Sequence, residues 1–144
     1  MADELVERLA KVDLFTGFSR KSMVKLSRSG REVQHQPGHE IASEGGGAAG
    51  FHLILAGEAR VEVGGVARRE LGPGDHFGEI SLVDGKPRSA TVLAGDDGLR
   101  TFAIPVWEFR SLLDEHPEMT RALLDNLCAR IRSVEATIRP RSPN

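Results

Sequence analysis

Apolar residues at the start of the chain recur with the period of a helix. Between residues 2 and 12 they share one face, with charged side chains around the rest: Leu5, Val6, Leu9 and Val12. This spacing predicts an amphipathic helix that ends before Gly17. Because Ser19 is a favourable N-cap residue, a second helix is expected over residues 20–28, with Gly30 as its stop.

From residue 31 to residue 104 the pattern changes to short runs in which apolar and polar residues alternate. Residues 61–63 alternate cleanly and precede Gly64-Gly65, a favourable two-residue hairpin turn. Frequent short strands between glycine and proline turn signals predict a β-sandwich or a β-barrel. By the same pattern, Asp96-Asp97 between two glycines is interpreted as the solvated tip of a hairpin.

Helical periodicity returns after residue 104. A helix is expected to begin at Pro105 or Val106 and to end at His116, because a residue before proline disfavours the helical conformation. Pro117 then suits the first position of a further helix that runs to about residue 137. The apolar residues of this last helix are spaced as in a heptad seam: Leu124, Leu127, Ile131, Val134 and Ile138. Such a seam packs either on the chain's own barrel or on a second copy of the chain.

The composition excludes several classes of protein. With 144 residues, of which 40% are hydrophobic and 28% charged, the chain is long enough for one domain with its own core. A net charge of −2 provides no basic field for nucleic acid or an anionic membrane. The single cysteine, Cys128, excludes an internal disulfide and fits a reducing cytoplasm. Because no apolar run approaches the ~20 residues of a transmembrane helix, we expect a cytoplasmic protein with no nucleic acid and no membrane as partners.

Histidines inside a barrel raise the alternative of a metal-dependent enzyme. The chain has five of them: His35, His39, His52, His76 and His116. Barrel metal sites usually begin with two histidines two residues apart on one strand, and this sequence has no such pair. No nucleophile-elbow motif accompanies its serine, histidine and aspartate residues either. We therefore predict a binding domain with neither a catalytic nor a metal site.

One glycine- and proline-rich stretch gathers groups that suit an anion. A short helix that starts near Gly78 has free backbone N–H groups at Ile80 and Ser81, which can bind a negative charge. Arg88 follows a turn and can reach the same anion through two parallel hydrogen bonds. Glu79 offers an acceptor for a hydroxyl group. A phosphate beside a free sugar hydroxyl would satisfy all three kinds of group.

The run FGEISL…PRSATV, residues 77–92, resembles the phosphate-binding cassette of the cyclic nucleotide-binding domain family. Residues 37–57 are also similar to the early strands of that family, which end in Ile-Leu-x-Gly. The resemblance covers most of residues 10–135. It implies a mainly β fold with flanking helices: an eight-stranded β-roll (a jelly-roll-like double-stranded β-helix) between N-terminal helices and two C-terminal helices.

A single domain over residues 1–138 is therefore expected. Its parts are helices over residues 2–30, the β-roll over residues 31–104 and helices over residues 105–138. Residues 139–144 contain two prolines and no apolar residue, so they are expected to form a disordered tail.

The resemblance also implies roles for the residues of the cassette. Arg88 would neutralise the cyclic phosphate, Glu79 would accept from the ribose 2′-hydroxyl, and Ser89 would add phosphate contacts. The other expected ligand-binding positions of the cassette are Phe77, Gly78, Ile80, Ser81 and Ala90. Val61 and Leu71 belong to the expected barrel wall, and either could also touch the purine.

The last helix leaves the choice of base open. Val134 and Glu135 match the positions that cap the adenine in transcription-activating members of the family, but they are not the hydroxyl pair found there. We expect cyclic AMP as the ligand, with cyclic GMP as the alternative and no further cofactor. Arg130, one turn earlier, could approach the phosphate from above.

The function that the resemblance implies is a two-state switch. Ligand would tighten the cassette, Leu82 would move relative to Phe109 and Leu112, and the last helix would swing about the break at residues 116–117. No DNA-binding, kinase-inhibiting or channel segment is recognised in the sequence, so the expected partner is an unknown effector protein, with nucleotide buffering as the other interpretation. A homodimer through the last helix is a further hypothesis. The alternative function is a nucleotide-free interaction or oligomerisation module with the same fold.

Overall fold

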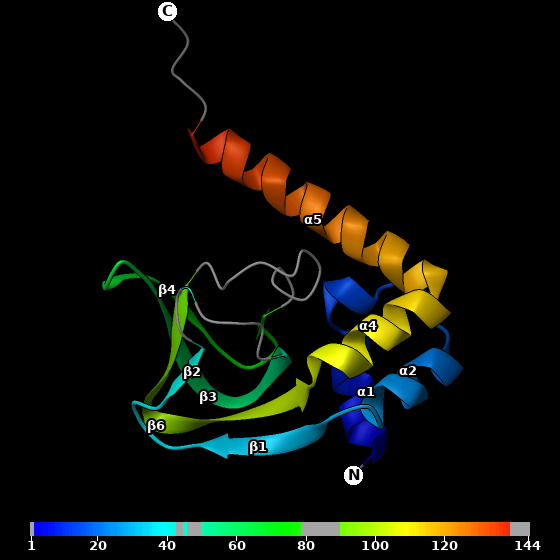
Figure 1. The fold of residues 1–144 in the computed structure, drawn as a ribbon, viewed down its shortest axis with the longest axis horizontal. Helices are drawn as coiled ribbons and strands as arrows, with labels where there is room; N and C mark the ends of the chain where they lie inside the picture. The colour runs from blue at the N-terminus through cyan, green and yellow to red at the C-terminus, as the bar shows by residue number, and fades with distance from the viewer. Residues whose placement is uncertain (1, 43–44, 46–49, 79–89, 139–144) are drawn as a thin grey trace, which may run out of the picture.

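The computed structural model describes residues 2–42, 45, 50–78 and 90–138, and in this part of the chain helices flank an antiparallel sheet (Figure 1). Before the strands come α1 (Ala2–Ala10), the 3₁₀ turn η1 (Asp13–Phe15) and α2 (Arg20–Ser27), and after them come α4 (Val106–Glu115) and α5 (Pro117–Ile138). The strands are β1 (Arg31–His35), β2 (Glu40–Ala42), β3 (Phe51–Val63), β4 (Val66–Leu71), β5 (His76–Phe77) and β6 (Thr91–Ile104). The predicted order of helices, strands and helices is confirmed.

Two long strands organise the sheet. β3 pairs with β5 near its start and with β4 near its end, while β6 pairs with β2 near its start and with β1 near its end. β3 and β6 also pair with each other along most of their length. The resemblance implies eight strands, and the described residues contain six, of which β3 and β6 run unbroken through register shifts.

One of these register shifts corrects the interpretation of Asp96-Asp97. The two aspartates are solvent-exposed, but they lie inside β6 and form no hairpin tip, because residues 95–98 stand opposite the single residue Glu58 of β3. The two backbones approach closely there, so that a Cβ added to Gly57 would lie 2.3 Å from the carbonyl oxygen of Gly98. Both glycines have positive φ values, 84° and 81°. They allow a continuous strand to bulge where the sequence pattern suggested a reversal of the chain.

Several local predictions are confirmed. Gly64 and Gly65 have φ values of 60° and 78° and join the paired residues of β3 and β4, as a type I′ hairpin requires. Ser19 caps α2, since its hydroxyl oxygen accepts from the backbone N–H of Ser22 at 3.1 Å. Pro117 is the first residue of α5.

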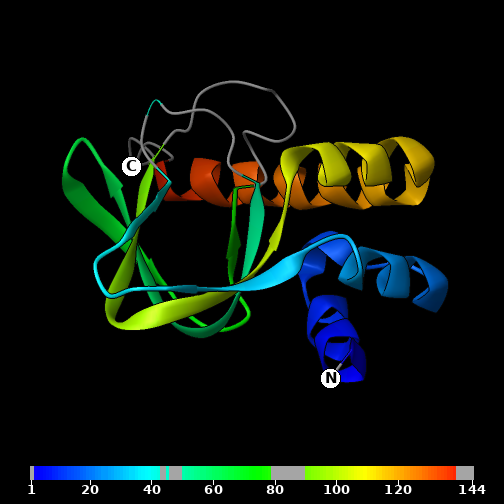
Figure 2. The ribbon, with the colours of Figure 1, turned by 60° about the horizontal axis from the view of Figure 1, so that its bottom comes forward.

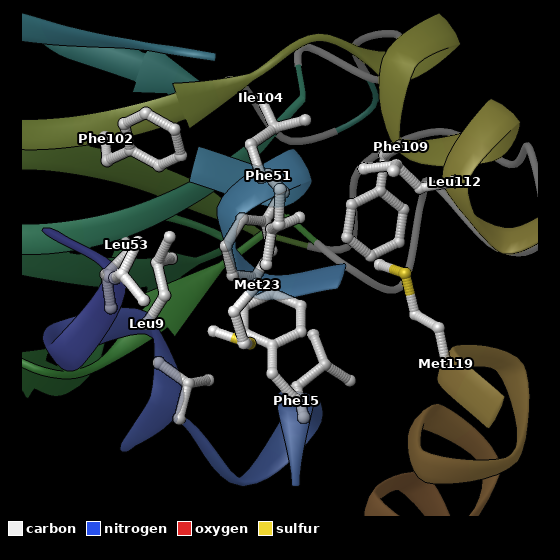
Figure 3. Close-up of a cluster of buried hydrophobic side chains, with 14 of the residues drawn as sticks. Leu9, Phe15, Met23, Phe51, Leu53, Phe102, Ile104, Phe109, Leu112 and Met119 are labelled. Carbon is white, nitrogen blue, oxygen red and sulfur yellow. The ribbon is translucent and has the colours of Figure 1, made fainter. Parts of the chain in front are cut away.

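The buried side chains form two clusters on opposite faces of β3. Leu53 and Leu55 belong to the first, the helix-sheet cluster, which joins the sheet to the helices. Ile54 between them belongs to the second, which lies on the other face of the sheet formed by β1–β6, called the roll below. In the first cluster Phe51 lies between Phe15 and Phe109, with ring centroids 5.5 Å and 5.6 Å away (Figure 3). These aromatic contacts hold α4 and the N-terminal helices against one end of the sheet.

Among the described residues, the contacts of the last helix with the domain come from its first part. Met119 and Leu123 are buried in the helix-sheet cluster, and Leu127 is packed partly against it. Farther along, α5 runs back past the roll (Figure 1, Figure 2). Three seam residues are largely exposed there: Leu124 (52%), Ile131 (57%) and Val134 (57%). At these three positions the seam does not pack on the chain's own barrel, because Met119 and Leu123 supply the face that does.

Candidate functional site

The cassette falls mainly in the part of the chain that the structure leaves undescribed. Five of the predicted site residues lie outside the described residues, as does the side chain of Arg130: Glu79, Ile80, Ser81, Arg88 and Ser89. The two described ends of the cassette are nevertheless fixed. Phe77 pairs with His52, the second residue of β3, and Thr91 pairs with Glu62, the last but one. The cassette is therefore attached to the roll at opposite ends of β3.

The structure brings several predicted residues together inside the roll. Phe77, Val61 and Leu71 are all buried in the cluster that fills it, and Ala90 packs partly against that cluster. Gly78 follows Phe77 with a φ of 99°, a conformation that favours glycine. Val134 and Glu135 are placed differently, because both are exposed on the outer part of α5.

Small residues line the wall of the roll near the second end of the cassette. Ala59 of β3 faces Ala94 of β6, and Val61 faces Val92 two residues farther along. All four are buried. Facing pairs of alanine and valine form an apolar surface with few projecting atoms, which is suited to a flat apolar ring.

A buried polar network supports the first end of the cassette. The ring of His52 stacks on Phe77 with centroids 4.9 Å apart and planes within 5°. His52 Nδ1 and His35 Nε2 each lie 3.0 Å from the hydroxyl oxygen of Thr101, which is fully buried. Because the hydroxyl has one proton, it can donate to only one ring, so the other ring must donate to it. The network therefore fixes the orientation of His52 beneath Phe77.

Sequence reasoning missed this network. His35, His52 and Thr101 are far apart in the sequence and meet only through the pairing of β6 with both β1 and β3. Burial, and then the nearby charge of His39, lowers the pKa of His35 below its usual 6.5. The ring of His39 stacks on that of His35 with centroids 5.9 Å apart. Among the described residues, however, no three histidine, cysteine, aspartate or glutamate side chains are gathered so that they could hold a metal ion.

The described part of the chain is an antiparallel six-stranded sheet with flanking helices and an apolar wall where β3 faces β6. The chain belongs to the cyclic nucleotide-binding domain family, whose model matches residues 32–116. The match includes the whole cassette and all of the sheet except Arg31. In the described part of the chain, no helix has the length and hydropathy needed to cross a membrane.

Three curated relatives illustrate the range of proteins that contain this domain. The chain is 27% identical over 131 residues to a CRP-like cAMP-activated global transcriptional regulator of Mycobacterium tuberculosis, covering 88% of this chain and 58% of that protein. It is 33% identical over 116 residues to a cAMP-dependent protein kinase regulatory subunit of Eremothecium gossypii, covering 74% of this chain and 25% of the relative. It is 30% identical over 105 residues to a cGMP-dependent protein kinase of Toxoplasma gondii, covering 73% of this chain and 11% of the kinase. The chain thus spans less than two thirds of the length of each.

Solved structures agree with this fold. The catabolite activator protein of Thermus thermophilus matches with a TM-score of 0.76 and 25% identity, over 88% of this chain and 61% of that one. The N-terminal domain of a transcriptional regulator from Streptomyces coelicolor matches with a TM-score of 0.75 and 23% identity, over 93% of this chain and 99% of that one. The regulatory domain of Toxoplasma gondii PKA, crystallised with cAMP, matches with a TM-score of 0.76 and 20% identity, over 92% of this chain and 50% of that one. The last two, below 25% identity, are similar in fold alone.

Proposed function

We propose that this domain binds a cyclic nucleotide, with cyclic AMP as the expected ligand, and acts as a non-catalytic sensor. One observation carries the proposal: the cassette sequence has every element of the family pattern, and its two described ends are attached to the roll beside a wall of small apolar residues. Two of the three relatives described above have cyclic AMP in their names and one has cyclic GMP, which supports cyclic AMP as the first ligand to test.

In this proposal the polar groups of the cassette hold the sugar and the phosphate. Arg88 neutralises the phosphate, and Glu79 accepts a hydrogen bond from the ribose 2′-hydroxyl. The remaining phosphate contacts come from the N–H groups of Ile80 and Ser81 and from Ser89. The purine lies along the wall that includes Val61 and Leu71, which are 7% exposed each. Arg130, Val134 and Glu135 of α5 are proposed to approach the ligand when α5 turns.

The contacts of α4 support a route from ligand to effector. Phe109 and Leu112 of α4 are buried in the helix-sheet cluster, and Phe109 stacks on Phe51 at the start of β3. His116 separates α4 from α5 and leaves the helical conformation, with φ −128° and ψ 85°. We propose that the ligand shifts the cassette against α4 and that α5 turns about His116, where an effector protein or a second copy of the chain detects the change.

Titration calorimetry tests the proposed function. We expect cyclic AMP to bind with micromolar affinity, about −8 kcal/mol, and 5′-AMP to bind far more weakly. Arg88→Ala should weaken binding of cyclic AMP by roughly 2–5 kcal/mol, because a phosphate charge would be left unpaired. Arg100→Ala, which removes an exposed arginine of β6, is the matched control and should bind normally.

Two outcomes would contradict the proposal. An absence of both heat and thermal stabilisation at millimolar cyclic AMP and cyclic GMP would favour the nucleotide-free interaction module instead. Equal affinities of wild type and Arg88→Ala would mean that the nucleotide binds elsewhere. Tighter binding of cyclic GMP than of cyclic AMP would keep the site and reverse the choice of base.

A further inference from the structure

An open groove of about 610 Å³ lies between the end of α2 and the start of α4. Residues 28–31 and Val33 form one wall, residues 105–108 form the other, and His52 and Ala103 lie between them. None of these positions belongs to the cassette or to the buried cluster of the roll. The groove therefore lies outside the proposed nucleotide site, and it shares with the supports of that site His52, whose ring stacks on Phe77.

Trp107 is the most unusual residue of this groove. It is the only tryptophan of the chain, and 71% of its surface is exposed, whereas Phe109 and Leu112 of the same helix are buried in the helix-sheet cluster. A tryptophan ring offers a large rigid apolar surface together with an N–H donor, and for this reason tryptophan is enriched where proteins bind one another. Neither packing nor the proposed nucleotide site accounts for its position.

Two arginines make the groove positive. Arg28 and Arg31 are exposed, and in the described part of the chain neither makes an ion pair. The neighbouring cations differ, because Lys25 pairs with Glu115 at 2.7 Å and Arg20 lies 3.8 Å from Asp3. Glu108 also lines the groove, so these three side chains leave one net positive charge. Tryptophan and arginine are both enriched at the energetic centre of protein interfaces.

We propose that this groove is the docking site for an acidic peptide segment of a partner protein. Carboxylates of the segment pair with Arg28 and Arg31, and an apolar side chain packs on Trp107 above Val33 and Ala103. A peptide fits better than a nucleic acid, because two arginines on a chain of net charge −2 neutralise few phosphates. If the proposed function holds and the partner is the effector of the switch, then peptide and nucleotide should change each other's affinity by the same factor.

The single tryptophan allows a direct test by fluorescence. The probe is the peptide acetyl-Glu-Asp-Phe-Asp-Glu-amide, and its neutral counterpart is acetyl-Gln-Asn-Phe-Asn-Gln-amide. We expect the acidic peptide to shift the emission of Trp107 to shorter wavelength with saturation, and the neutral peptide to bind far more weakly. Arg28→Ala and Arg31→Ala should each weaken the acidic peptide about tenfold. Arg68→Ala, an exposed arginine on β4, should change nothing.

The outcomes separate the docking site from the nucleotide site. No emission shift at millimolar peptide, equal binding of the two peptides, or wild-type affinity in both arginine variants would each overturn the docking site. A DNA duplex that perturbs Trp107 at lower concentration than the peptide would also overturn it, in favour of nucleic acid. Peptide binding without any cyclic nucleotide binding would keep the groove and remove the proposed switch. In the variant Trp107→Phe, calorimetry should show part of the wild-type affinity for the acidic peptide, because a smaller aromatic ring remains.

Discussion

Thr101 connects two histidines that are 17 positions apart in the sequence. Its hydroxyl oxygen lies 3.0 Å from one nitrogen of each ring, and the side chain is fully buried. A buried polar group that loses its partner must bear the full cost of having left water. The network is therefore stabilising only while every member is present.

Thr101→Val removes the shared hydroxyl and keeps the shape of the side chain. We expect the free energy of unfolding to fall by about 1–3 kcal/mol, because buried ring nitrogens lose their partner. Urea denaturation measures the change, with the exposed Thr16→Val as the matched control. A variant as stable as wild type would mean that the two rings find other partners when the hydroxyl is removed.

His35 should make the stability of the domain depend on pH. Its pKa in the folded chain lies below 6.5, so the unfolded chain binds the proton more readily. The resulting stabilisation is complete above pH 6.5 and is lost as the pH falls from 6.5 toward the folded-state pKa. We expect the free energy of unfolding to decrease over this range in wild type and to decrease less steeply in His35→Gln.

His39→Gln serves as the comparison for this pH experiment. It removes only the second cause of the shift, the charge of His39, and leaves the burial of His35 unchanged. Its pH dependence should fall between those of wild type and His35→Gln. Identical slopes for wild type and His35→Gln would show that other groups carry the pH dependence.

At the scale of the elements, α5 divides into two parts. Its first turns are held by Met119 and Leu123, and the exposed apolar residues of its second part include Ile131. Apolar residues spaced as in a heptad and exposed together are typical of a surface that pairs with another helix. We propose that a second copy of the chain covers this part of α5.

Ile131→Glu tests the pairing of α5. A charge in the seam should shift the protein to monomers in sedimentation experiments, while wild type should associate as concentration rises. Ser133→Glu adds the same charge at an exposed position between the seam residues Ile131 and Val134 and should associate like wild type. Wild type that remains monomeric at high concentration, with and without cyclic AMP, would contradict the dimer.

Whether a feature of an element could be predicted from the sequence depends on how far apart the residues are that form it. The caps, the Gly64-Gly65 turn and the break at His116 depend on neighbouring residues, so they could be predicted from local sequence. The bulge at Asp96-Asp97 could not, because it depends on which residues of β3 lie opposite. The same turn-forming composition suits both a hairpin tip and a bulge inside a strand.

At the scale of the whole molecule, the sequence predicts the family and the ends of the candidate site. It does not predict the side-chain contacts that support the site. Phe77 and Gly78 follow from a contiguous motif, and the family match confirms the resemblance on which they rest. The supports are contacts between distant parts of the chain: His52 beneath Phe77, and Phe51 between Phe15 and Phe109. Composition and spacing along the sequence contain no information about which distant residues meet.

The helix-sheet cluster has a consequence for synthesis on the ribosome. Its aromatic centre joins Phe15 and Phe51 to Phe109, and Phe51 pairs across the sheet with Ile104. On the ribosome, Phe15 therefore stays exposed until nearly all of the sheet and α4 have left the exit tunnel. Any nascent chain stalled before Phe109 would present unburied aromatic rings to chaperones, whatever the nucleotide supply in the cell.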